Sequence, residues 1–322
     1  MRKALVALAA AFALTVGAAD AALLALAPAE YTAVISLDLR RLLGNRDFRK
    51  WSESPAVAES LSELARAGMR ISGIRALAIF YWDDNWYGVL KPDPALRLRE
   101  ALERRCADPS SKITAETLAG RRVYLLRRPP TRGNRHKKKE LCFTFFGDDT
   151  AVVAKFVELE KFLRVRRLDP AEVARLAARD ADAWFVCRTH EGPGARRKNG
   201  ELGAFGIKHG ALELRLTGGE ATAVALSGVL GFSKSSKARE MSMTLPAILA
   251  FFTGLVFAED PEGGEQFVRA LRSEVRGKTL RLSLDVSEDL FRRFLRGLES
   301  LSGRQNGGGA PVKAPPPPRS VK

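Results

Sequence analysis

The densest group of side chains that could bind or react lies in residues 127–139. This segment carries seven cationic side chains and no acidic one before Glu140. Cations this close together attract phosphate or carboxylate polymers, and the attraction weakens as the salt concentration rises. We expect a loop between two strands that binds an anionic partner; the alternative is a hairpin loop whose charges are only solvated. The cationic residues are Arg127, Arg128, Arg132, Arg135, Lys137, Lys138 and Lys139.

A second candidate site is the aromatic pair Trp82 and Trp86, which flanks the turn residues 83–85 with their two carboxylates and one amide. Sugar sites combine aromatic faces with such polar groups, so the segment predicts a carbohydrate contact. The alternative is structural, since aromatic side chains paired across two strands stabilise a hairpin by up to about 1 kcal/mol a pair. The sequence leaves both interpretations open.

Catalytic and metal-binding signatures are missing from the sequence. It contains no GxSxG, HExxH, GxGxxG or phosphate-binding loop motif. Residues 190–194 begin like a metalloprotease helix, but they lack the second histidine, and Gly and Pro forbid the helix. We therefore expect no metal, no cofactor and no enzyme, and the catalytic residues of any reaction are unknown. The competing hypothesis is an envelope hydrolase whose site is assembled by folding between two halves of the chain.

Three cysteines are too few for a disulfide framework in a chain of this length. One pair could form in an oxidising compartment, and the sequence does not say which. Cys142 and Cys187 lie in apolar runs, so we expect them to be buried in strands as small hydrophobic residues. Cys106 is the third thiol.

The amino terminus has the layout of an export signal. Residues 1–3 are basic after the initiator, residues 4–16 are apolar but for one Thr, and small residues follow at 17–19 and at Ala21. This pattern predicts a signal peptide of residues 1–21, with a cleavage position ambiguous by a few residues. The expected location is therefore the periplasm or the medium. The alternative is an uncleaved anchor, because residues 22–27 are apolar too.

The whole chain carries a formal charge of +16, and residues 22–322 carry +15 once Arg2, Lys3 and Asp20 are removed. Such a balance favours anionic partners, here polysaccharide or lipid headgroups of the envelope. Nucleic acid is not the expected partner, because residues 127–139 have no aromatic side chains on which bases could stack. The alternative is that the charges are merely solvated.

Hairpins and helices recur without regular alternation, which predicts an α+β fold with antiparallel sheets and packed helices. Ser-Pro and Asp-Pro pairs mark helix starts, and runs of β-branched and aromatic residues mark strands. We expect strands at 31–38, 74–82, 86–91, 122–126, 141–146, 151–154, 183–188, 212–216, 221–226 and 279–286. We expect helices at 54–68, 93–102, 169–176, 248–257, 267–275 and 290–301, and the apolar segment 248–257 to be a core helix too short to span a bilayer.

The expected organisation is a signal peptide (1–21), an α+β half (22–168), a second α+β half (169–302) and a Gly/Pro-rich disordered tail (303–322). Residues 35–39 and 282–286 echo each other, both preceding an expected helix. Two halves related by duplication would explain the echo, and so would chance.

Residues 26–43, a Pro-plus-Ala lead-in, a strand ending in Asp and a Leu-rich helix, loosely resemble the opening of uncharacterised exported bacterial α+β proteins. The resemblance covers under a tenth of the chain and implies an exported, strand-rich protein without assigning any functional residue. Together with the charge, it leads us to expect an exported binding or structural protein of the envelope that contacts an anionic component through residues 127–139.

Overall fold

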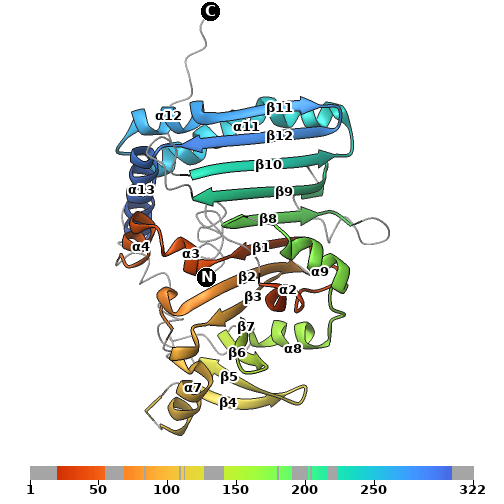
Figure 1. The fold of residues 1–322 in the computed structure, drawn as a ribbon, viewed down its shortest axis with the longest axis vertical. Helices are drawn as coiled ribbons and strands as arrows, with labels where there is room; N and C mark the ends of the chain where they lie inside the picture. Colours follow the sequence, from red (N-terminus) through yellow and green to blue (C-terminus); the bar gives the residue numbers. More distant parts are fainter. Residues whose placement is uncertain are drawn as a thin grey trace, which may run out of the picture.

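The computed structural model describes residues 20–54, 69–82, 85–108, 110–111, 113–126, 141–179, 181–190, 202–203, 205–216 and 224–306. They form one twelve-stranded sheet in which all neighbours are antiparallel, with helices packed against it (Figure 1). The expected α+β class with hairpin-built antiparallel pairing is therefore confirmed. The expected helix at 54–68, the turn residues 83–84 and 217–223, and the basic loop lie outside the described residues.

The strands, in chain order, are β1 (Ala33–Leu37), β2 (Ile74–Trp82), β3 (Asn85–Pro92), β4 (Ile113–Leu118), β5 (Arg121–Leu126), β6 (Leu141–Phe146), β7 (Thr150–Lys155), β8 (Ala183–Arg188), β9 (Ile207–Leu216), β10 (Val224–Phe232), β11 (Leu271–Arg276) and β12 (Thr279–Val286). Across the sheet they lie in the order β11-β12-β10-β9-β8-β1-β2-β3-β7-β6-β5-β4. The two expected halves meet near the middle of the sheet at β1 and β8, which are called the central pair here and are each the first strand of one half.

The helices are α2 (Ala21–Leu24), α3 (Leu39–Leu42), α4 (Arg46–Ser52), α7 (Leu98–Ala107), α8 (Phe156–Arg164), α9 (Pro170–Ala177), α11 (Ser235–Val256), α12 (Pro261–Ala270) and α13 (Glu288–Asn306), with short 3-10 turns η1 (Ile71–Gly73) and η2 (Pro94–Leu96). Several begin as the sequence predicts. Asp169 accepts from the Ala171 amide ahead of Pro170, and Asp260 accepts from the Gly263 amide ahead of Pro261.

The strand order is repeated on the two sides of the central pair. Moving outward, the first side reads β1, β2, β3, β7, β6 and the second reads β8, β9, β10, β12, β11. On each side the outer hairpin, β6–β7 or β11–β12, has its second strand nearer the central pair. The hairpin β4–β5 is added at the edge of the first side. The echo noted above equates β1 with β12, which occupy different places in this order, so it does not mark the repeat; a duplication remains a prediction.

Helices cover the two faces of the sheet unequally. On one face, which we call the first face, residues of α3, α4, α7, α12 and α13 pack against Ile35, Leu37 and their neighbours, and α11 packs beside them. On the second face, residues of α2, α8 and α9 pack on Val34, Phe80 and Val186. Helix α8, after β7, lies on the second face, whereas α13, after β12, lies on the first. The described residues therefore leave the second face of β9, β10, β12 and β11 without a helix (Figure 1).

Three expectations need correction. The helix expected at 267–275 ends at Ala270, and residues 271–276 form the edge strand β11. There Leu271, Ser273 and Val275 alternate with charged residues, and pairing with β12 overrides helical periodicity. Residues 303–306, expected to belong to the tail, are part of α13, which continues to Asn306, and residues 307–322 lie outside the described residues.

The third correction concerns residues 248–257, expected as a core helix. They belong to the longer α11, where Phe251 and Phe252 are exposed and Thr253 is buried. The helix uses its inward side to cover the sheet, and apolar side chains on its outward side are left at the surface. A run of apolar residues cannot by itself distinguish these two placements.

Candidate functional site

The uncovered second face of β9, β10, β12 and β11, together with the neighbouring strand β8 on which α9 packs, is called the open face here. Alternation along each strand sets its composition, because residues opposite one another in an antiparallel pair point to the same side. One row across the five strands consists of Trp184, Glu213, Ser227, Ser283 and Arg272. The next row consists of Val186, Ala211, Val229, Arg281 and Glu274.

A groove of about 1080 Å³ runs over this face. The small residues Ala211, Ser227 and Gly228 line the middle of its floor beside the exposed Val229. Helix α9 forms one wall, and the outer strands β12 and β11 form the other. Small residues in the middle and long charged residues at the sides therefore make the open face concave. Antiparallel sheets often leave one face to solvent, so the wall from α9 is what turns this face into a groove.

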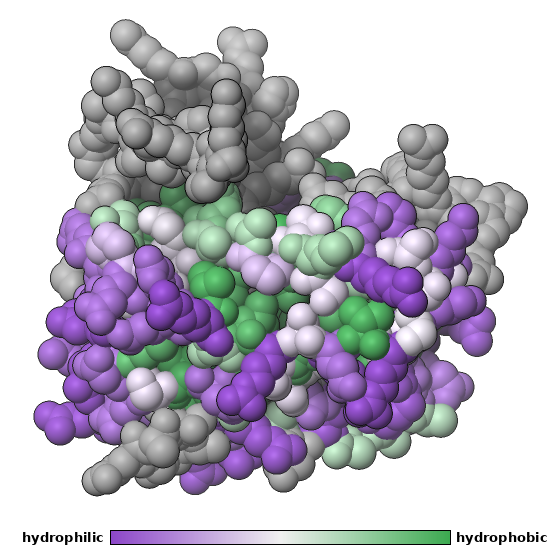
Figure 2. All heavy atoms as spheres, turned by 90° about the horizontal axis from the view of Figure 1, so that it is seen from above, coloured by the Kyte–Doolittle hydropathy of each residue, from purple (hydrophilic) through white to green (hydrophobic). Residues whose placement is uncertain are grey.

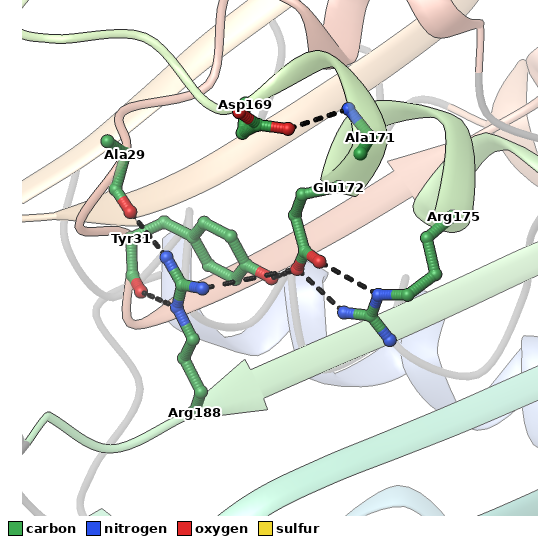
Figure 3. A network of polar contacts seen from close by, with 7 residues as sticks. All are labelled: Ala29, Tyr31, Asp169, Ala171, Glu172, Arg175 and Arg188. Atoms are coloured by element: carbon green, nitrogen blue, oxygen red, sulfur yellow. Dashed lines mark hydrogen bonds and ion pairs between the residues drawn. The ribbon is translucent and has the colours of Figure 1, made fainter.

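The α9 wall rests on a polar network around Glu172 (Figure 3). Arg175 donates to both carboxylate oxygens at 2.8 and 2.6 Å, and the hydroxyl of the fully buried Tyr31 donates to Oε1 at 3.1 Å. The hydrogen bonds from Arg175 chiefly lower the pKa of Glu172. Glu172 is therefore an ionised structural anchor with both oxygens engaged, and it is not placed to act as a general base.

Arg188, at the end of β8, joins the network from below. Its guanidinium donates to the backbone carbonyls of Ala29 and Tyr31 and lies 4.0 Å from the centre of the Tyr31 ring. One guanidinium nitrogen is also 4.0 Å from Glu172. These contacts hold a cation at the foot of the groove, where its positive charge is only partly compensated.

The opposite wall carries cations with no partner of their own. Arg272 and Arg281 make no hydrogen bond or ion pair with any of the residues that the structure describes, and both are exposed. Glu274, directly across from Arg281, is engaged by Arg276 at 2.7 Å. Arg179 on the α9 side is paired with Glu213 at 2.5 Å. Of the five arginines that line the groove, these two are thus available to an anion.

The cysteine that lines the groove is not placed to act as a nucleophile. Cys187 of β8 lies beside the groove, but its thiol points to the first face of the sheet. Burial raises the pKa of this thiol to about 11. A thiol in this state is not a nucleophile at neutral pH. All three cysteines are free, and the strand cysteines Cys142 and Cys187 are buried as expected. Within the described ranges no group of three or more His, Cys, Asp or Glu side chains could hold a metal ion.

The basic residues Arg127 to Lys139 lie outside the described residues, so the structure does not place their side chains. The strands on either side do form the expected hairpin, with Leu126 opposite Leu141. β5 and β6 lie near the β4 edge of the sheet, whereas the open face lies at the β11 edge. The strands that hold the loop are therefore far along the sheet from the groove.

Trp82 and Trp86 are not brought together. Trp86 lies opposite Tyr81 and packs on the first face, whereas Trp82 packs on the second face beside Tyr87. The ring centroids are 4.9 Å apart for Tyr81 and Trp86 and 5.7 Å apart for Trp82 and Tyr87. One sugar cannot contact both tryptophans from opposite sides of a sheet. The cross-strand aromatic pairs fit the structural interpretation of this hairpin.

Arg272, Arg281 and Arg188 were not singled out from the sequence. The usable signal was the alternation of residues 279–286, in which every second residue is polar or charged. That pattern predicts a strand with one solvent-exposed face. It does not predict that cationic side chains of other strands lie on the same face of the sheet. The helix predicted at 267–275 includes Arg272, so the sequence pattern does not place this arginine on a strand.

Comparisons with models of known protein families, with curated protein sequences and with solved structures find no match to this chain. No helix in the described part of the chain is long and apolar enough to cross a membrane.

Proposed function

We propose that this chain is an exported, non-enzymatic protein of the cell envelope that binds an anionic component, foremost an acidic polysaccharide, on its open face. The observation that carries the proposal is the pair Arg272 and Arg281, exposed on one wall of the groove and without partners among the described residues. Unpaired guanidinium groups are the natural partners of carboxylates and phosphates.

The shape of the site supports an extended ligand. The groove spans five strands and is open to solvent, so it suits a polymer lying across the strands rather than an enclosed small molecule. Arg272 and Arg281 on the β12–β11 wall, with Arg188 across the groove at the end of β8, would contact such a polymer. In this proposal the basic loop 127–139 is a second site that contacts the anionic polymer. A long polymer would reach both the groove and the loop.

Replacing Arg272 and Arg281 with serine is expected to weaken binding of polygalacturonate about tenfold, since each exposed ionic contact contributes roughly 0.2–1 kcal/mol. The measurement is a titration at low salt and again at about 0.15 M salt, where screening removes non-specific attraction. The matched control is Lys50→Gln with Arg104→Gln, which removes the same charge from exposed positions of α4 and α7 on the first face.

The proposal for the open face fails if both double variants bind alike. A third variant, with the seven cations of residues 127–139 changed to serine or glutamine, then tells whether the loop carries the binding. Vesicles of phosphatidylglycerol and duplex DNA, titrated in parallel, distinguish a lipid headgroup or nucleic acid from the polysaccharide.

Export is the other part of the proposal, and the contacts of Asp20 suggest where processing occurs. Its carboxylate accepts from the Ala22 amide at 2.9 Å and pairs with Lys91 at 2.8 Å, and the next residues Leu23 and Leu24 are buried. Cleavage after Ala21 would remove a helix cap and an ion pair, whereas cleavage after Ala19 keeps both.

We therefore expect the exported chain to begin at Asp20, two residues earlier than the boundary expected from the sequence. Mass spectrometry of the amino-terminal peptide, recovered from the periplasm of an expression host, measures this directly. A chain beginning at Ala22 would contradict the prediction, and one that keeps Met1 would support the uncleaved anchor.

A further inference from the structure

Helix α11 exposes an unusually apolar surface. Seven large hydrophobic side chains are exposed among the described residues, and four of them lie on this helix: Met243, Phe251, Phe252 and Leu255. Phe251 and Met243 are 66% and 76% exposed. Viewed from above, hydrophobic residues (green) lie at the surface between hydrophilic ones (purple) (Figure 2). A surface helix normally turns charged residues outward. These exposed hydrophobic side chains of α11, called the stripe here, therefore indicate a surface that binds a partner.

The stripe is separate from the side of α11 that covers the sheet. Ala238, Met241 and Leu245 pack inward against the first face, and Ser242 contacts Ser273 of β11 at 3.1 Å. The outward positions recur three or four residues apart, from Met243 through Ala247 and Phe251 to Leu255. No charged residue occurs between Glu240 and Glu259. The core of the domain therefore does not use the stripe.

The two ends of the stripe carry opposite charges. At the start of α11, Lys237 is paired with Glu240 at 2.8 Å, and the remaining cations are Lys234 and Arg239. Just beyond its end lie the exposed carboxylates Glu259 and Glu262, the latter in the first turn of α12. A positive end, an apolar middle and a negative end make a surface that is complementary to itself when reversed.

We propose that the stripe binds a second copy of this chain, with the two α11 helices antiparallel about a two-fold axis. In that arrangement the basic end of each helix meets the acidic end of its partner, and the isologous contact closes after two copies. The charge pattern argues against an anionic membrane as the occupant, because Glu259 and Glu262 would face the lipid headgroups at one end.

The helix is long enough for such an interface. Its 22 residues span roughly 33 Å at about 1.5 Å a residue. The axis would pass at the level of residue 249, midway between Arg239 and Glu259, where Ala247 and Ala250 allow the helix axes to approach to about 8–10 Å. Phe251 and Leu255 of one copy then pack beside Met243 and Ala247 of the other. Because α11 lies on the first face, the dimer leaves the open face of both copies accessible.

The first test is the mass of the exported, purified chain by sedimentation equilibrium over a range of protein concentrations. The wild type is expected to be a dimer, and Phe251→Glu with Leu255→Glu is expected to raise the dissociation constant about 100-fold or more, because burying unpaired carboxylates is costly. The control Phe205→Glu changes an exposed phenylalanine outside the stripe and should leave the dimer intact.

The second test uses charge reversal and does not depend on apolar packing. One variant carries Lys234→Glu and Arg239→Glu, so both ends are acidic; the other carries Glu259→Lys and Glu262→Lys, so both ends are basic. Each variant alone should be a monomer, whereas an equimolar mixture should form a mixed dimer. That rescue requires charge contacts between the helix ends of the two copies and also shows that both variants are folded; the antiparallel direction follows from the wild type, whose like-charged ends would meet in a parallel pair.

Other outcomes overturn the proposal. A monomeric wild type that binds phosphatidylglycerol vesicles through Phe251 would make the stripe a membrane contact. A wild type that becomes dimeric only after residues 307–322 are deleted would show that its own tail covers the stripe. A dimer unaffected by both sets of substitutions would place the interface elsewhere.

Discussion

Gly297→Ala is expected to destabilise the protein by about 3 kcal/mol, although alanine is the better helix former. Gly297 lies in α13 where that helix crosses the end of α11. A β-carbon there would lie 2.0 Å from the Val256 carbonyl oxygen and 2.9 Å from its carbonyl carbon. Backbone atoms cannot rotate away, so α13 must shift. Overpacking of this kind costs about 1–3 kcal/mol or more, which exceeds the gain in helix propensity of about 1 kcal/mol.

The cost is placed at the upper end of that range because the displaced helix anchors a cluster. Phe294, one turn earlier, stacks on Phe267 with centroids 5.2 Å apart, and Arg293 holds Asp260 at 2.6 and 2.5 Å. Urea denaturation measures the loss. The control is Gly254→Ala on the exposed side of α11, where a β-carbon meets nothing within 4 Å; measured at sub-micromolar concentration, it should be neutral or stabilising by about 0.5–1 kcal/mol. Equal stability of Gly297→Ala and wild type would contradict the packing argument.

The second large effect is a loss of stability at alkaline pH that comes from Tyr31. Burial, and then the neighbouring Glu172, raise the pKa of Tyr31 to about 12, against a compensating effect of Arg188. The unfolded chain ionises its tyrosines near pH 10, so this contribution to stability is complete below pH 10 and is lost as the pH rises toward 12. A difference of two pKa units corresponds to about 2.7 kcal/mol.

Tyr31→Phe should therefore flatten the fall in unfolding free energy between about pH 10 and pH 12. At neutral pH it should cost only about 1 kcal/mol, the typical net contribution of the lost hydrogen bond to Glu172. Tyr124, which donates to Glu103 at 2.5 Å, also has its pKa raised to about 12, so Tyr124→Phe should remove a further part of the slope. An unchanged slope in the double variant would show that neither tyrosine controls alkaline unfolding.

Local patterns were reliable wherever one segment pairs with its neighbour in the chain. The bounds expected for 74–82, 141–146, 183–188 and 279–286 match β2, β6, β8 and β12, because each carries a β-branched, aromatic or strictly alternating apolar pattern. The helix start at Asp169 was equally clear, since a capping carboxylate and Pro170 act within one turn. Such signals involve a few adjacent residues and do not depend on the rest of the fold.

The candidate site could not be predicted from such local patterns. Arg188 is far in the sequence from the hairpin that carries Arg272 and Arg281, and all three line one groove only because β8, β9, β10, β12 and β11 align in one sheet. The two tryptophans illustrate the same limit in reverse: Trp82 and Trp86 are neighbours along the chain, yet strand alternation sends them to opposite faces. Proximity in sequence predicted a shared site that the register forbids.

By itself the sequence determined the antiparallel α+β class, most strands and the strong positive charge, because composition and period-two patterns report local backbone preference and burial. Only the tertiary structure decided that both halves share one continuous sheet and that α13 packs on the first face, leaving a groove opposite. It also decided that α11 covers the sheet with one side and exposes Phe251 on the other. These outcomes depend on which surfaces are already occupied when a helix packs, and that competition involves the whole chain.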